Sequence, residues 1–283
     1  MVKLHENDIK TKDVLSMKGL HLFHFNFSAC SMKTRIFLNL KNAEYIPHHI
    51  DLTKKENFSD YFQGISPRSL VPVLVSDGEV HIESNDILKF LERKIPDPVL
   101  IPIEKTEEIN DLLDIEDELH IDIRNVTFKY LVPKFLASKE VPKKVENKAT
   151  LNGREDSIDN KNRKYWKEYS KNGIPDEVAV KSLLRLRSHL ETFNEGLAHH
   201  TYLLGNELSV IDIAWFIYVT RLKTAKYPVH ILHPHVNDWY EKLNENEMFA
   251  KEVKLPWPSK ILFTLHYAYQ KYFGKSIKKI LLD

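Results

Sequence analysis

The residue best equipped for chemistry in this sequence is its only cysteine, Cys30. An apolar run with aromatic residues, typical of a strand, precedes it at 22–25, and a helical apolar stripe begins at Ile36. We therefore expect Cys30 in the first turn of a helix whose N-cap is Ser28. Unpaired backbone N–H groups and the helix dipole favour a thiolate there. A lone cysteine is also often a small buried apolar residue, so position alone leaves both interpretations open.

The elements that must position this cysteine form a compact α/β pattern over residues 20–97, after a polar arm at 1–19. Asp77-Gly78 separates two β-rich runs, which is a strong hairpin signal. The predicted elements are a strand at 22–25, a helix after Ser28, a strand at 48–52, a helix at 53–63, strands at 71–75 and 79–82, and a helix at 84–95.

The remainder of the chain is helical in its pattern and predicts a separate all-α domain over 103–255, after a proline-bounded linker at 98–102. Ser209 and Asp212 form a capping arrangement at the start of one of its helices. The stretch 138–171 is polar, and we expect an irregular insertion with no more than a helical turn near Tyr165. The predicted fold class is α/β plus all-α.

Composition excludes several classes of function. Hydrophobic residues make up 42% of the chain, charged residues make up 29%, and the net charge is +1, so no nucleic-acid partner is expected. One cysteine excludes an internal disulfide. The first residues are polar, with Lys and Glu, so we expect no secretory signal. No apolar run reaches the roughly 18 residues of a spanning helix. We expect a cytoplasmic protein.

Residues 256–283 differ from the rest because an apolar helical face is combined with five lysines between Lys260 and Lys279. A basic amphipathic helix can lie on a membrane surface. Such a segment more often packs on its own domain, which is the expectation here.

The histidines between His230 and His235 are close enough to suggest a metal. Pro234 breaks the helical register and no cysteine or carboxylate completes a ligand set, so no metal site is expected. The few glycines include no phosphate-binding loop.

Taken together, four features resemble the cytosolic glutathione transferase superfamily. They are the order of the two domains, Val71-Pro72 at a strand start, Glu83-Ser84 at a helix start, and the capping motif Ser209-Val210-Ile211-Asp212. The resemblance covers residues 20–255. It implies a thioredoxin-like N-terminal domain, a C-terminal helical bundle, glutathione as cofactor and a homodimer.

The resemblance also implies roles for individual residues. Pro72 matches a cis-proline that presents the Val71 backbone to the cysteinyl part of glutathione. Glu83 and Ser84 match the pair that holds its γ-glutamyl end. Ser28 falls where a hydroxyl stabilises the glutathione thiolate, and Cys30 falls where a thiol forms a mixed disulfide with glutathione. The implied lining residues for a small hydrophobic electrophile are Tyr130, Trp215, Tyr218 and Arg221.

Within the superfamily, Ser28-Ala29-Cys30-Ser31 is similar to the tetrachlorohydroquinone dehalogenase and zeta (maleylacetoacetate isomerase) branches. Ala29 replaces the second serine of the zeta signature, which argues against isomerase activity. The expected function is glutathione transfer, with Cys30-dependent thiol transfer, reductive dehalogenation or deglutathionylation as a variant. Two alternatives stay open: a β-etherase, whose branch also carries an insertion in the helical domain, and a non-catalytic binding or interaction protein on the same fold.

Overall fold

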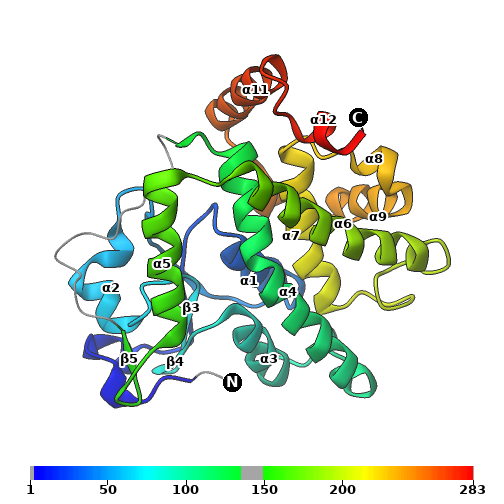
Figure 1. Cartoon of the computed structure of the whole chain (residues 1–283). Coiled ribbons are helices and arrows are strands. Elements are labelled where there is room, and N and C mark those ends of the chain that lie inside the picture. Colours follow the sequence, from blue (N-terminus) through cyan, green and yellow to red (C-terminus); the bar gives the residue numbers. More distant parts are fainter. Residues whose placement is uncertain (1–2, 135–148, 283) are drawn as a thin grey trace. The chain divides into compact units, whose positions relative to one another are not determined.

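The computed structural model describes residues 3–134 and 149–282, which fall into two compact units (Figure 1). The described part of the first unit is 3–98 and 149–171, and that of the second is 99–134 and 172–282. The division between 98 and 99 lies at the start of the expected linker. Residues 138–148 of the expected insertion lie outside the described residues.

The first unit is built on a four-stranded sheet in the order β2-β1-β3-β4. Strand β1 is parallel to β2 and antiparallel to β3, which in turn pairs with β4 as a hairpin. The elements are β1 (Leu20–His24), α1 (Ala29–Leu40), β2 (Ile46–His49), α2 (Asp60–Ile65), β3 (Val73–Ser76), β4 (Glu79–His81) and α3 (Ser84–Lys94). This β-α-β-α-β-β-α order confirms the predicted one, although the helix expected at 53–63 is reduced to the short α2.

The strand register brings three chemically relevant segments to one edge of the sheet. Phe23, near the end of β1, pairs with Val73 at the start of β3, and Leu74 pairs with His81 at the end of β4. Three features therefore lie at this same edge. The start of α1 follows the end of β1, the Val71-Pro72 bond precedes the start of β3, and the start of α3 follows the end of β4. The Asp77-Gly78 turn lies at the opposite edge and has the two positive φ angles of the predicted hairpin.

The N-terminal arm is part of the core of the first unit, contrary to its interpretation as a separate polar arm. Leu4, Ile9 and Val14 are buried in a cluster with Phe62 of α2 and with side chains of three strands, such as Val73. The sequence pattern does not predict this burial, because the three apolar residues follow no helical or strand period. They lie in or beside two short 3-10 turns, Glu6–Asp8 and Lys12–Ser16.

The described part of the 138–171 stretch is ordered into a hairpin and a helix, so its interpretation as an irregular insertion was wrong. The elements are β5 (Thr150–Leu151), β6 (Arg154–Glu155) and α5 (Ser157–Asn172). Residues 149–171 group with the first unit rather than with the helical one. The physical reasons are that Leu151 packs on the core of the first unit and that the Asn152 N–H donates to the Asp8 carboxylate (3.2 Å).

The second unit is all-helical, as predicted. Its central helix α7 (Val210–Thr224) contacts α4 and α9 and is apolar all round, so most of its side chains are buried. The predicted capping box of Ser209 and Asp212 starts it. The other helical elements are α4 (Thr106–Val126), the π-helical turn η5 (Thr127–Leu131), α6 (Asp176–Leu197), α8 (Val229–Leu232), α9 (Pro234–Glu245), α10 (Glu247–Val253), α11 (Trp257–Tyr272) and α12 (Ile277–Leu282).

In the described part of the chain, no helix combines the length and the apolar character that crossing a membrane requires.

The contact between the arm and α2 provides a test of the fold. A Cβ at Gly64 would lie 2.0 Å from Thr11 Oγ1 and 2.9 Å from Thr11 N. We expect Gly64→Ala to lower the free energy of unfolding by about 1–3 kcal/mol, measured by urea denaturation. Gly196→Ala in α6 is the matched control, because a Cβ there meets nothing within 4 Å. Equal stabilities of the two variants would contradict the described packing of the arm.

Candidate functional site

The N-terminus of α1 places a hydroxyl and a thiol side by side, as expected. Ser28 is the N-cap, and its Oγ accepts a hydrogen bond from the Ser31 N–H at 3.3 Å. Cys30 is the second residue of the helix and is half-buried, so its thiol lies in the first turn with partial access to solvent. This geometry confirms the local prediction that started from the cysteine.

A buried arginine holds the loop that leads into this helix. Arg35 Nη1 lies 3.1 Å from His24 Nδ1 and donates to the Phe25 carbonyl at 3.4 Å, while Nη2 donates to the Asn26 carbonyl at 3.2 Å. These carbonyl groups belong to the turn between β1 and α1, where the Phe25 carbonyl also accepts from the Ser28 N–H at 3.1 Å. Arg35 therefore fixes the turn that positions Ser28.

The second component is the bond between Val71 and Pro72, which is cis, as the resemblance implied. Pro72 is buried and Val71 is half-buried directly before β3. This is the sheet edge at which α1 begins.

The third component is the start of α3. The helix begins at Ser84, which is buried, and its N-cap is Glu83 rather than the serine. Glu83 has a φ of +66°, an uncommon conformation for a residue with a side chain. Backbone strain of this kind is concentrated at functional sites.

A buried hydrogen bond connects the starts of α1 and α3. Lys33 Nζ donates to Asn85 Oδ1 at 2.6 Å, and both side chains are buried. Because a buried ammonium group is costly unless it is hydrogen-bonded, this contact restricts how the two helices can lie relative to each other.

Arg68 links the candidate site to the segment 149–171. Its guanidinium forms an ion pair with Glu83 and a two-pronged contact with Asp156, from Nε to Oδ1 at 3.1 Å and from Nη2 to Oδ2 at 2.6 Å. The side chains of Arg68 and Asp156 are each only 7% exposed. Asp156 also accepts from the Asp159 N–H at 2.8 Å and so caps α5.

Arg68 and Asp156 each shift the pKa of the other away from its ordinary value. Burial opposes ionisation of Asp156, but the hydrogen bonds from Arg68 and from the α5 backbone outweigh it and lower the pKa of its carboxyl group. Sequence reasoning missed both residues, because 88 positions separate them and neither belongs to a motif. The Asn152-Gly153 hairpin signal could have indicated structure beside Asp156.

This arrangement has the chemistry of a site for an anionic ligand. Two helix N-termini at one sheet edge offer backbone N–H groups to anions. One carries a hydroxyl and a thiol, and the other carries a buried hydroxyl beside a carboxylate held by an arginine.

The four expected electrophile-lining residues lie in the second unit. Trp215 and Tyr218 are fully buried and pack edge to face in its core, with the Tyr218 hydroxyl donating to the Glu116 carbonyl (2.8 Å). They are core residues because α7 is apolar all round. Arg221 is half-buried. Tyr130 is buried, and its hydroxyl has no hydrogen-bond partner among the described residues.

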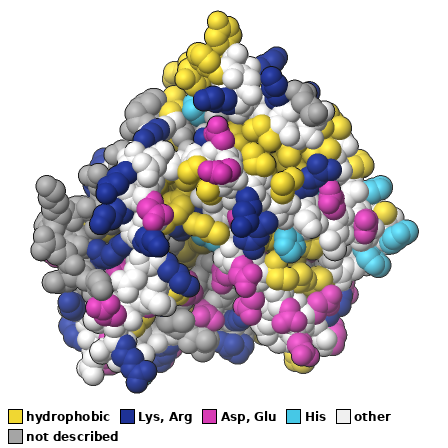
Figure 2. Space-filling model, viewed as in Figure 1, with side chains coloured by type: hydrophobic (Ala, Val, Ile, Leu, Met, Phe, Trp, Pro, Cys, Tyr) yellow, Lys and Arg dark blue, Asp and Glu magenta, His cyan; other side chains and the backbone are white. Residues whose placement is uncertain are grey.

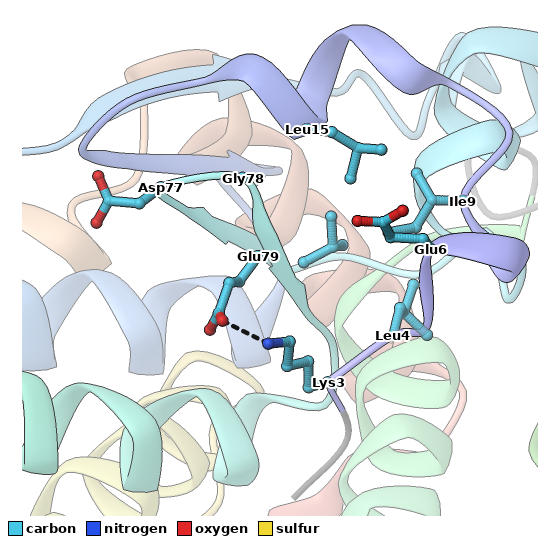
Figure 3. Close-up of a pocket in the computed structure, with 9 residues that line it drawn as sticks. Lys3, Leu4, Glu6, Ile9, Leu15, Asp77, Gly78 and Glu79 are labelled. Carbon is cyan, nitrogen blue, oxygen red and sulfur yellow. Dashed lines mark hydrogen bonds and ion pairs between the residues drawn. The ribbon is translucent and has the colours of Figure 1, made fainter.

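A separate pocket of about 230 Å³ lies at the other edge of the sheet, beside the β3–β4 turn (Figure 3). It is lined by the arm and the hairpin, and Lys3 forms an ion pair with Glu79 across it. Neither Cys30 nor Ser84 lines it. In residues 3–134 and 149–282, no group of three or more His, Cys, Asp or Glu side chains is arranged to hold a metal ion.

Family models match two parts of the chain. Residues 27–94 match the model described as "Glutathione S-transferase, N-terminal domain", and residues 178–242 match "Glutathione S-transferase, C-terminal domain". The first match contains the site residues of α1 and α3 together with Arg68, Val71 and Pro72, the second contains Arg221, and Tyr130 and Asp156 lie in neither match.

Curated relatives fall into two groups. A maleylpyruvate isomerase from Ralstonia sp. is 37% identical over 83 residues, which is 29% of this chain and 39% of the relative, so the similarity spans well under half of that protein. A zeta-class glutathione S-transferase from Euphorbia esula is 39% identical over 83 residues, again 29% of this chain, and 37% of its own length. The protein LigF from Sphingobium sp. strain SYK-6 is 26% identical over 246 residues, 82% of this chain and 93% of its own.

Solved structures share the fold. The β-etherase LigF structure from Sphingobium sp. has a TM-score of 0.70 at 22% identity and covers 82% of this chain and 98% of its own. A glutathione transferase homologue from Drosophila mojavensis with bound glutathione has a TM-score of 0.61 at 16% identity and covers 89% and 98% of the two chains.

The Arg68–Asp156 pair predicts a specific loss of stability. Asp156→Asn keeps a side chain that can cap α5 but removes a buried charge, so we expect the free energy of unfolding at pH 7 to fall by roughly 1.5–3 kcal/mol. Glu191→Gln, in the exposed Arg187–Glu191 pair, is the control and should cost less than about 0.5 kcal/mol.

The same pair predicts a pH dependence. The folded-state pKa of Asp156 lies below its ordinary value of 3.8. The contribution of this carboxylate to the free energy of unfolding is therefore complete above pH 3.8 and is lost as the pH falls through the lowered folded-state pKa. The stability gap between the wild type and Asp156→Asn should therefore narrow below about pH 4. A gap that stays constant down to acid denaturation would contradict the ion pair.

Proposed function

We propose that the chain is a member of the glutathione S-transferase superfamily, two of whose domain models it matches. In this proposal it is an enzyme that binds glutathione at the sheet edge shared by α1 and α3 and activates the glutathione thiol for attack on a small hydrophobic electrophile. One observation carries the proposal: the helix N-termini that bear Ser28, Cys30 and Ser84 meet at the edge where the cis Val71-Pro72 bond lies.

The α3 end fits the γ-glutamyl part of glutathione. Backbone N–H groups at the start of α3 and the Ser84 hydroxyl can donate to the γ-glutamyl carboxylate. The Glu83 side chain is 35% exposed, and one of its carboxylate oxygens is held by Arg68. Its second oxygen can accept from the ammonium group of the ligand. Val71 would offer its backbone groups to the cysteinyl residue.

The α1 end fits the thiol. A free thiol of this kind is mostly protonated at pH 7, and the attacking species is the thiolate. Ser28 Oγ already accepts from the Ser31 N–H. A serine hydroxyl has one proton to donate besides its acceptor pairs, so Ser28 can direct that proton at the sulfur anion. The dipole of α1 supports the same charge.

Cys30 allows a second, reductive step on a glutathionyl adduct. Its thiolate attacks the glutathione sulfur, a sulfur–sulfur bond forms, and the bond from that sulfur to the product breaks. The electron pair leaves with the product, which takes up a proton. A second glutathione thiolate then releases Cys30 and yields oxidised glutathione.

A β-etherase activity is the second candidate function, because the LigF similarity extends over 82% of the chain whereas the isomerase and zeta-class similarities cover 29%. Here the activated thiol displaces an ether oxygen instead of another leaving group. The third alternative is a glutathione-fold binding protein without turnover. The expected lining residues Tyr130, Trp215, Tyr218 and Arg221 remain the proposal for the electrophile. We also infer a homodimer from the family.

Replacing Ser28 tests thiol activation. We expect Ser28→Ala to lower kcat/KM for conjugation to 1-chloro-2,4-dinitrobenzene by about 100-fold, in the range seen when one preorganised donor is lost. Ser59→Ala is the matched control, because Ser59 caps α2 through the Phe62 N–H in the same way. If both variants lose activity equally, Ser28 acts as a cap and not on the thiol.

Replacing Cys30 tests the reductive step. Cys30→Ser should keep conjugation within about threefold, since the helix dipole and Ser28 remain, but should lose release of the reduced product from a glutathionyl adduct. Mass spectrometry should find glutathione on the wild-type cysteine during turnover. Full reductive activity in Cys30→Ser would remove Cys30 from the mechanism. If the wild type binds glutathione but turns over no electrophile or aryl ether, the binding-protein alternative is favoured.

A further inference from the structure

Helix α11 carries an apolar stripe that faces solvent. Trp257, Ile261, Leu265 and Tyr269 follow one another at four-residue intervals and are 73%, 51%, 64% and 59% exposed. Tyr272, which lies on the same side, is 85% exposed. Figure 2 shows hydrophobic side chains gathered where α11 lies in Figure 1. A contiguous exposed patch of this kind marks an interaction site.

The opposite side of α11 fixes this orientation. Gln270 is buried, and its Nε2 donates to the carbonyls of Lys129 (3.2 Å) and Tyr130 (3.1 Å) in η5. A helix on the surface of a soluble domain normally turns its apolar stripe inward and its polar face outward. Here the buried Gln270 and the half-buried Leu262, Phe263 and Tyr267 face the unit, and a second apolar stripe is left outside. The expectation that the segment packs on its own domain is therefore met by one side of the helix only.

The segment is also strongly basic. Six of the chain's 41 Lys and Arg residues lie between Lys254 and Leu282, and none of its 40 Asp and Glu residues does, although the whole chain carries a net charge of only +1. Lys260 and Lys271 lie on one flank of the stripe, because eleven residues correspond to about three helical turns. Both are exposed, as are Lys275, Lys278 and Lys279.

We propose that the stripe Trp257–Tyr272 docks on the surface of an anionic lipid membrane, with the aromatic and aliphatic side chains in the interfacial layer and the lysines on acidic headgroups. Tryptophan and tyrosine favour that layer because their rings are apolar at one end and polar at the other. Lysines beside an apolar face are typical of helices that lie in the plane of the interface.

Charge argues against a second copy of the chain as the occupant. Two such stripes packed face to face would bring the lysines of both copies together, with no acidic residue between 254 and 282 to compensate them. Anionic headgroups offer the complementary charge over a flat surface, which suits a stripe on one straight helix.

Vesicle binding by the full chain tests the proposal. Wild-type protein should sediment with vesicles of phosphatidylcholine mixed with phosphatidylglycerol, much less with phosphatidylcholine alone, and the binding should weaken as salt is added. The double variant Leu265→Ser/Tyr269→Ser should bind at least about tenfold more weakly. Ile103→Ser, which changes an apolar side chain that is 91% exposed elsewhere, should bind like the wild type.

Fluorescence gives a second measurement. Of the four tryptophans, Trp215 and Trp239 are buried and Trp166 is half-buried in α5, whereas Trp257 is 73% exposed. Vesicle binding should therefore shift the emission of Trp257 to shorter wavelength, and the shift should persist in Trp166→Phe but be lost in Trp257→Phe. Failure of the wild type to bind mixed vesicles, or equal binding by the double variant, would overturn the proposal. Self-association of the wild type that is lost in the double variant, without vesicle binding, would assign the stripe to a second copy and overturn it too.

Discussion

The geometry of the candidate site rests on the buried hydrogen bond from Lys33 to Asn85 near the starts of α1 and α3, and the ion pair between Lys41 and Glu92 (2.7 Å) joins the same two helices near their other ends. The strand register brings the starts of α1 and α3 to one sheet edge, but register alone leaves each helix free to rotate or slide. A buried ammonium group requires its acceptor, so this contact fixes how the thiol-bearing and carboxylate-bearing ends lie with respect to each other. Substituting an apolar residue for either partner would preserve packing volume but lose that constraint.

Arg68 connects the start of α3 to the segment 149–171, which lies far from it in the sequence. The guanidinium satisfies Glu83, a strained residue at the start of α3, and Asp156, the cap of α5, at the same time. Because a buried arginine needs anionic partners, the segment 149–171 contributes to the electrostatics of the site without belonging to the sheet. The conformation of Glu83 is thus supported from outside its own helix.

Local signals explain what the sequence predicted correctly. The capping serines, the Asp77-Gly78 turn and the apolar periods act over fewer than ten residues, so they reveal helix starts and the hairpin. Tertiary contacts explain the rest. Arg68 and Asp156 are 88 positions apart, and the arm residues Leu4 and Ile9 follow no period. The place of Trp215 could not be predicted, because an apolar helix shows no polar face to distinguish core from pocket.

Direct titration of glutathione provides the sharpest test that a tripeptide binds across the starts of α1 and α3. Calorimetry with the full chain should detect saturable binding at one site per chain, and Ser84→Ala should weaken that binding by about tenfold, as expected when one hydrogen bond to a charged group is lost. Absence of measurable heat, or an unchanged affinity in Ser84→Ala, would contradict the assignment of this edge as the glutathione site.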